Sequence, residues 1–121
     1  MSGAERRKAP RLDHGFLVSY RCPQLGQTEW MRSPIKDLSL LGIRFIGDLG
    51  YPVGVVLEMR LSLPTVDKPV EVMGQVMWER RLGSGTLTEH GLLFLNLASG
   101  VHQQVKEAIE FFLRKDQSGA S

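Results

Sequence analysis

Short segments in which apolar and polar residues alternate fill most of this sequence, and turns rich in glycine or proline separate them. In the clearest segment, Val70, Val72 and Val76 alternate with Glu71 and Gln75. Alternation of this kind has the period of a β-strand with one buried face. Six such segments occur, with no predicted helix between them: 15–21, 28–36, 42–46, 55–63, 70–80 and 89–95. Six strands joined by turns favour an antiparallel sheet that closes into a small barrel or packs as a sandwich, and closure would also remove the exposed edges.

The end of the chain has the period of a helix instead. Its apolar residues recur at intervals of three and four and are Val101, Val105, Ala108, Ile109 and Phe112. This stripe predicts an amphipathic helix with Ser99 as its N-cap. We expect the stripe to pack on the barrel, although Phe111 and Leu113 widen it enough to leave partner binding as an alternative. The predicted fold class is therefore all-β with one C-terminal helix.

A single domain accounts for the whole chain. With 121 residues, of which 42% are hydrophobic, the chain can bury one core but not two. We divide it into a flexible basic arm at 1–12, the barrel at 13–97, the helix at 98–116 and a disordered tail at 117–121.

Positive charge is concentrated in the predicted arm. The whole chain has a formal net charge of +2, whereas residues 1–12 hold four cations and one glutamate, which leaves the remainder net negative. The four cations are Arg6, Arg7, Lys8 and Arg11. Proteins that bind DNA or RNA duplexes usually spread basic residues over a face, so this distribution favours a small anion over DNA or RNA.

The sequence lacks the signatures of disulfide-bonded, membrane-spanning and secreted proteins. Cys22 is the one cysteine, which excludes an intrachain disulfide and fits a reducing compartment. No apolar run is long enough to span a membrane, and the N-terminus lacks the hydrophobic core of a signal peptide. We therefore expect a soluble cytoplasmic protein with no membrane insertion.

Catalytic signatures are absent from the sequence as well. His14, His90 and His102 lack the spacing of metal ligands, and Cys22 has no identifiable histidine partner. The glycine-rich segment 83–91, GSGTLTEHG, lacks the lysine and the following helix of a phosphate-binding loop and is typical of a flexible hairpin. We therefore predict neither an enzyme nor a bound metal or other cofactor.

The predicted arm contains the pattern Arg-x-x-x-Arg, formed by Arg7 and Arg11. Pro10 disfavours a helix there, so the segment is predicted to be extended. Each guanidinium can bind a phosphate or the edge of a guanine through two parallel bonds, and it can also stack on a base. On composition alone, a solvated basic terminus explains the same residues.

A second pattern, DLSLLG, joins the second and third predicted strands. The Asp37 carboxylate can accept hydrogen bonds from the N–H groups of a guanine, and the Ser39 hydroxyl can serve a phosphate or cap the turn. Gly42 provides either a positive backbone dihedral or room for another group to approach closely. Taken alone, the pattern is also compatible with an ordinary turn in which aspartate and serine bond the local backbone.

Together, Arg-x-x-x-Arg and Asp-x-Ser-x-x-Gly in a six-strand domain with a C-terminal helix resemble the PilZ domain of bacteria. The resemblance extends from Arg6 to about Leu113. It implies a six-stranded barrel that binds the second messenger cyclic di-GMP. The residues that match the two ligand-binding motifs of the family are Arg7, Arg11, Asp37, Ser39 and Gly42.

Arg6 stands directly before the arginine motif. Members of the family with an arginine there tend to bind two mutually intercalated cyclic di-GMP molecules, so the resemblance implies the same here. Four phosphate charges then lie close together, and an additional guanidinium offsets their repulsion.

The resemblance also implies how a signal is transmitted. The arm folds over nucleotide docked on the outer surface of the barrel, and an unidentified downstream protein reads the change, in control of motility, adhesion or exopolysaccharide export. The alternative is an adaptor that binds a protein partner without nucleotide, as some PilZ-like proteins that lack the motifs do.

Several other side chains are candidate auxiliary contacts. Arg44 could reach a phosphate, although an exposed strand arginine is the simpler interpretation. Trp78 could stack on a base, but its alternation with the preceding valines favours the core. Trp30 is likewise expected to pack within the sheet, and Arg80 and Arg81 to be auxiliary contacts or a solvated edge.

Overall fold

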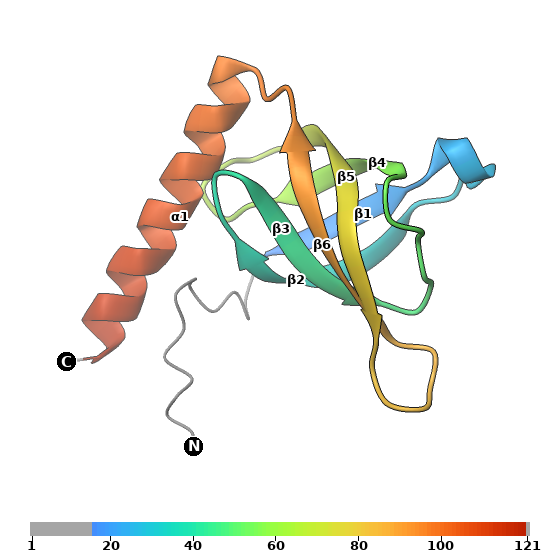
Figure 1. Cartoon of the computed structure of the whole chain (residues 1–121). Coiled ribbons are helices and arrows are strands. Elements are labelled where there is room, and N and C mark those ends of the chain that lie inside the picture. Colours follow the sequence, from blue (N-terminus) through green and yellow to red (C-terminus); the bar gives the residue numbers. More distant parts are fainter. Residues whose placement is uncertain (1–15, 121) are drawn as a thin grey trace.

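Six antiparallel strands close into a barrel in the computed structural model, which describes residues 16–120 and the side chains of 16–114 (Figure 1). The strand order around the barrel is β1-β2-β3-β6-β5-β4. The strands are β1 (Leu17–Arg21), β2 (Met31–Leu38), β3 (Gly42–Gly47), β4 (Val56–Ser62), β5 (Val70–Arg81) and β6 (Thr88–Leu95). A short 3-10 helix, η2 (Pro23–Leu25), follows β1, and the helix α1 (Ser99–Ala120) follows β6. The predicted barrel is thus confirmed.

The pairing of β1 with both β2 and β4 closes the barrel. Leu17 stands opposite Pro34 on one side and Ser62 on the other. Side chains alternate between the inside and the outside, as the period of two requires. The interior is filled by apolar residues with little or no exposed surface, among them Val18, Tyr20, Ile35, Phe45, Leu57, Leu61 and Val76.

A shift of register in β5 changes which side chains face the solvent. Val76 pairs with Leu92, and Trp78 pairs with Gly91, the residue adjacent to Leu92 in the antiparallel strand β6. Met77 is therefore an extra residue in β5. A bulge of this kind places two consecutive side chains on one side of the strand. Met77 and Trp78 are accordingly both exposed.

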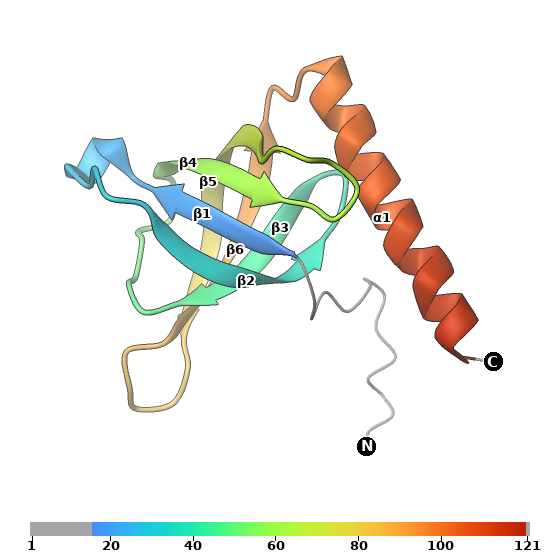
Figure 2. The ribbon, with the colours of Figure 1, turned by 180° about the vertical axis from the view of Figure 1, so that it is seen from behind.

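The helix α1 packs against one end of the barrel through its apolar stripe. Val105 and Ala108 are fully buried, and the ring of Phe112 meets the ring of Phe16 edge to face at 5.5 Å between centroids. Packing of the stripe on the barrel is therefore confirmed. The lower part of the helix runs past the barrel, as the two opposite views show (Figures 1 and 2).

The bounds of α1 differ from those predicted. The helix runs to Ala120 and so continues into the segment 117–121 that was expected to be a disordered tail. The segment 117–121 contains no proline. Every residue in it therefore has the backbone N–H that continuation of the helix requires. Within residues 16–120, no helix combines the length and the apolar character needed to cross a membrane.

His90 is a fully buried polar residue in the barrel. Its Nε2 accepts a hydrogen bond from the N–H of Tyr51 at 3.2 Å, while Nδ1 has no hydrogen-bond partner among the described residues. Burial lowers the pKa of His90, and the nearby carboxylates of Glu79 and Glu89 oppose that shift only in part. His90 is therefore neutral in the folded protein at neutral pH.

This burial predicts a dependence of stability on pH. Below the ordinary histidine pKa of 6.5, the unfolded chain takes up a proton that the folded chain refuses, so the free energy of unfolding falls as the pH falls. The slope contributed is at most about 1.4 kcal/mol per pH unit. The variant His90→Gln retains an acceptor for the Tyr51 N–H. We expect its free energy of unfolding, measured with urea, to depend less on pH than that of the wild type between about pH 7 and about pH 5.5. His102→Gln, on the exposed side of α1, is the matched control. Equal slopes in wild type and His90→Gln would contradict the prediction.

Candidate functional site

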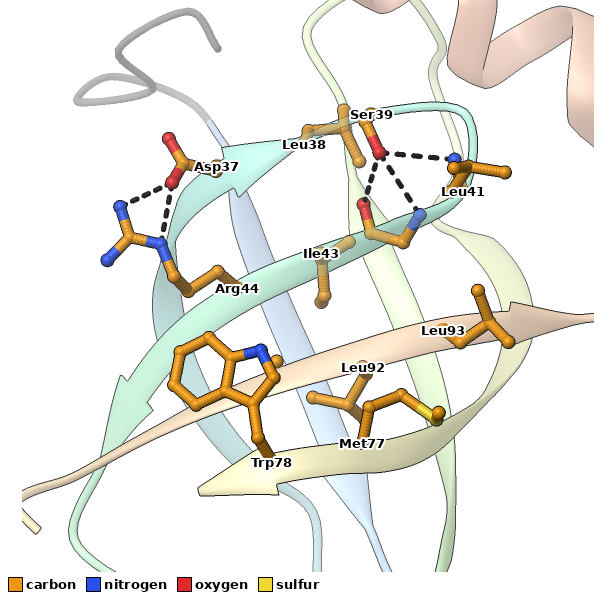
Figure 3. Close-up of a pocket in the computed structure, with 12 residues that line it drawn as sticks. Asp37, Leu38, Ser39, Leu41, Ile43, Arg44, Met77, Trp78, Leu92 and Leu93 are labelled. Carbon is orange, nitrogen blue, oxygen red and sulfur yellow. Dashed lines mark hydrogen bonds and ion pairs between the residues drawn. The ribbon is translucent and has the colours of Figure 1, made fainter. Parts of the chain in front are cut away.

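A pocket of about 340 Å³ lies on the outer surface of the barrel, between the β2–β3 turn and strands β5 and β6 (Figure 3). Five residues singled out in the sequence line it: Asp37, Ser39, Gly42, Arg44 and Trp78. Its remaining surface is largely apolar and includes Leu41, Met77, Leu92 and Leu93. The pocket therefore combines charged groups on one side with an apolar wall on the other.

The β2–β3 turn is held by Ser39. Its Oγ accepts hydrogen bonds from the N–H groups of Leu41 at 3.1 Å and Gly42 at 3.3 Å, as Figure 3 shows. The hydroxyl of Ser39 also donates to the carbonyl oxygen of Gly42 at 3.4 Å. Of the two roles considered for this hydroxyl, the structure shows the turn cap.

Gly42 is needed because another strand approaches it closely. Its backbone dihedral is not positive, but a Cβ at this position would overlap the carbonyl oxygen of Leu92 in β6. Of the two explanations considered for this glycine, close approach is therefore the one that the structure supports. The contact brings the turn directly against the strand that forms the floor of the pocket.

A chain of charges crosses the outer surface on strands β2, β3, β6 and β5. Nε of Arg44 donates to Oδ2 of Asp37 at 2.6 Å, and its Nη2 is ion-paired with the same oxygen. Nη1 of Arg44 is ion-paired with Glu89, whose other oxygen accepts from Arg80 at 2.5 Å. Arg44 is therefore neither a free strand arginine nor a free phosphate ligand.

The pKa values of this chain of charges favour the ionised forms. Burial opposes the charge of Glu89, but the hydrogen bonds from Arg44 and Arg80 outweigh it and lower the pKa of Glu89. Burial likewise opposes the charge of Arg44, and the bonds to Glu89 and Asp37 outweigh it and raise the pKa of Arg44. Both groups are consequently charged at neutral pH.

Trp78 lies on the surface, not in the core, so the favoured sequence interpretation was wrong. The side chain is 41% exposed because the bulge at Met77 reverses the alternation that the preceding valines establish. The indole ring lies against Gly91, where a Cβ would overlap the indole nitrogen. Trp78 thus presents an aromatic face beside Arg44 (Figure 3).

The other candidates lie elsewhere. Arg80 is exposed beyond its ion pair with Glu89, and Arg81 lines a separate hollow beside Thr88. Trp30 does not pack within the sheet: it precedes β2, half-buried, with the guanidiniums of Arg21 and Arg60 each 4.3 Å from its ring centre. The arm residues, Arg6, Arg7 and Arg11, lie outside the described residues.

Sequence reasoning missed Glu89 and the apolar wall of Leu41, Met77 and Leu93. Glu89 faces outward from β6, directly opposite Arg80, yet only 3% of its side chain is exposed because two arginines cover it. The place of Glu89 in a chain of charges that spans four strands could be read only from the strand register. Among the described side chains, those of residues 16–114, no group of three or more metal-ligating residues could hold a metal ion.

The sequence model of the PilZ domain matches residues 5–111. This chain belongs to the PilZ domain family. A comparison with curated protein sequences found no match to this chain. Solved structures with the same fold include the PilZ domain with c-di-GMP of YcgR from Escherichia coli, which is 18% identical with a TM-score of 0.68, over 95% of this chain and 97% of that one.

Two further solved structures cover nearly as much of this chain. The inhibitor of motility MotI/DgrA from Bacillus subtilis is 19% identical with a TM-score of 0.68, over 93% of this chain and 52% of its own. MrkH of K. pneumonia in its apo state is 14% identical with a TM-score of 0.74, over 94% and 53%. This PilZ domain thus spans about half the length of these two proteins and shares their fold.

Proposed function

We propose that this PilZ domain is a receptor for cyclic di-GMP that binds the nucleotide in the pocket beside Asp37. The observation that carries the proposal is the convergence of the Asp37–Gly42 turn with the start of β1. The carbonyl oxygen of Phe16, just before β1, accepts a hydrogen bond from the N–H of Ile35 at 3.1 Å. Asp37 is two residues farther along β2, about 7 Å away.

The arginine motif is close enough in the chain to reach this turn. Arg11 precedes Leu17 by six residues, which can span at most about 20 Å. Arg7 and Arg11 can therefore stand over the pocket without any change in the barrel. The segment 1–12 acts as an arm that folds over the bound nucleotide.

The pocket offers groups for each part of the ligand. The carboxylate of Asp37 accepts hydrogen bonds from the N–H groups of one guanine, and the exposed ring of Trp78 stacks on a base. The arginines of the arm bind the phosphates. Ser39 and Gly42 contribute by holding the turn in place. Arg80 is separated from Asp37 by Glu89 and Arg44, so it serves at most as an auxiliary contact.

Isothermal titration calorimetry of the purified chain tests the proposal. Cyclic di-GMP is expected to bind, whereas GMP, GTP and cyclic di-AMP, which keeps the phosphates but lacks the guanine amide, are not. Binding should weaken with added salt because charged groups supply most of the contacts. No heat of binding with cyclic di-GMP at about 100 μM would overturn the proposal and favour a nucleotide-independent adaptor.

The same titration measures stoichiometry. Because Arg6 precedes the arginine motif, we propose that two intercalated nucleotides bind each chain, with Arg6 offsetting the repulsion between their phosphates. A stoichiometry of one would contradict this.

Signal output follows from the ordering of the arm. Fixing each residue costs about 1–2 kcal/mol, which charge-assisted bonds of about 1.5–3 kcal/mol each must exceed. The ordered arm and the covered apolar wall then form a surface that a downstream cytoplasmic protein reads. Motility, adhesion and exopolysaccharide export are the processes we propose for it.

A further inference from the structure

Glu89 is a buried carboxylate that the proposed binding contacts do not use. Its two oxygens have different partners: Oε2 is ion-paired with Arg44, and Oε1 accepts from Nη2 of Arg80 at 2.5 Å. A carboxylate that is only 3% exposed needs such partners, because an unpaired buried charge is strongly unfavourable. Each oxygen of Glu89 therefore holds one of the two arginine side chains in position.

Arg44 connects Glu89 to the proposed ligand site. With Nη1 held by Glu89, Arg44 turns Nε and Nη2 toward Asp37, and both contact the single oxygen Oδ2. No described residue bonds Oδ1 of Asp37, which points away from Arg44 (Figure 3). One oxygen of Asp37 is thus occupied and fixed, and the other is open.

A guanidinium without a second carboxylate prefers another arrangement. It forms a two-oxygen fork, in which parallel N–H bonds engage both oxygens of one carboxylate. Such a fork between Arg44 and Asp37 would occupy Oδ1. Nη1 lies on the far side of the guanidinium from the Nε–Nη2 edge, so its ion pair with Glu89 fixes the position of the guanidinium. In that position both donors of the edge meet Oδ2 alone.

We propose that Glu89 is a positioning residue for guanine recognition, which holds Arg44 on one oxygen of Asp37 and so keeps the other oxygen free for the ligand. This inference rests on the proposed function. Glu89 itself does not contact the nucleotide. It acts through Arg44, from the neighbouring strand.

Calorimetric titration with cyclic di-GMP of Glu89→Gln, which keeps the shape of the side chain but not its charge, tests the proposal. We expect affinity to fall by about tenfold. General electrostatics predicts the opposite sign, because removal of a negative charge favours an anionic ligand. Glu58→Gln is the matched control: Glu58 is also ion-paired, with Arg21, but it lines a different pocket. Its affinity is expected to stay within about twofold of wild type. Wild-type affinity in Glu89→Gln would overturn the proposal.

Variants of Arg44 show whether Glu89→Gln lowers affinity through Arg44 or through a general disturbance of the fold. We expect Arg44→Gln to weaken binding, because Asp37 then loses both donors that fix its position. Addition of Glu89→Gln to Arg44→Gln should change affinity by less than about twofold, because the residue that transmits the effect is gone. A further tenfold loss in the double variant would overturn the proposal. Should Glu89→Gln fail to fold by circular dichroism, Arg44→Gln is the decisive variant, and unchanged affinity there overturns the proposal.

A measurement without ligand distinguishes this inference from the proposed function. The side-chain Nε–Hε resonance of Arg44 in the ¹H–¹⁵N spectrum reports its bond to Asp37. We expect the resonance to shift in Glu89→Gln and to stay in place in Glu58→Gln. An unshifted resonance overturns the positioning role, whereas failure of the wild type to bind cyclic di-GMP overturns the proposed function and leaves the spectral test valid.

Discussion

Replacement of Arg7 or Arg11 by alanine is expected to lower the affinity for cyclic di-GMP by about 100-fold or more and to leave the barrel intact. Each guanidinium can form two parallel charge-assisted bonds to a phosphate or a guanine edge, at about 1.5–3 kcal/mol for each bond. Loss of two such bonds exceeds the about 2.7 kcal/mol that corresponds to 100-fold. Calorimetric titration measures the effect, and circular dichroism checks the fold.

A matched control comes from the barrel itself. Arg32 is an exposed arginine of β2 that does not line the pocket, and Arg32→Ala removes the same charge. We expect the affinity of Arg32→Ala to remain within about threefold of wild type, since long-range attraction between exposed charges is screened by salt. If Arg7→Ala or Arg11→Ala binds as well as Arg32→Ala, the arm does not bind the nucleotide.

The strands of the barrel were predictable because the alternation of apolar and polar residues depends on one property alone, namely which face of the strand is buried. Val70, Val72 and Val76 occupy every second place, and all three are inside. A closed barrel gives each strand one inner and one outer face, so alternating burial also recurs in β1, β3 and β4. The turn residues Ser39 and Gly42 were also identifiable, because a cap and a close approach require particular residue types.

The outward position of Trp78 was not predictable from the same pattern. An extra residue at Met77 leaves no signature in hydrophobic alternation, since methionine and tryptophan are both apolar. The bulge is visible only once the register between β5 and β6 is known. Its consequence is an aromatic ring on the pocket wall that strict alternation would place in the core.

The chain of charges was hidden for a related reason. Asp37, Arg44 and Arg80 could each be identified singly, but the link between Arg44 and Arg80 passes through Glu89, which lies 45 residues beyond Arg44. Neighbours across strands depend on register, and one residue of slip would move each side chain to the other face. The sequence therefore identified the polar residues that line the pocket, but neither Glu89 nor the contacts that connect these residues.

Gly42→Ala is expected to destabilise the barrel by about 2–3 kcal/mol and to reduce ligand binding as well. The added Cβ would overlap the carbonyl oxygen of Leu92, so two backbones would have to separate where β3 pairs with β6. Backbone atoms in a closed barrel cannot move aside as a flexible side chain can. Urea unfolding should show a lower midpoint with an unchanged slope.

Gly85→Ala is the matched control for this substitution. Gly85 lies in the β5–β6 hairpin loop, its dihedral is not positive, and a Cβ there would meet no atom within 4 Å. Its stability should change by less than about 0.5 kcal/mol. Because Gly42 belongs to the turn that carries Ser39, separation of the strands also displaces Asp37, so the loss of stability and the loss of affinity should occur together. An unfolding midpoint for Gly42→Ala equal to that of Gly85→Ala would show that β3 and β6 do not approach as closely as the turn requires.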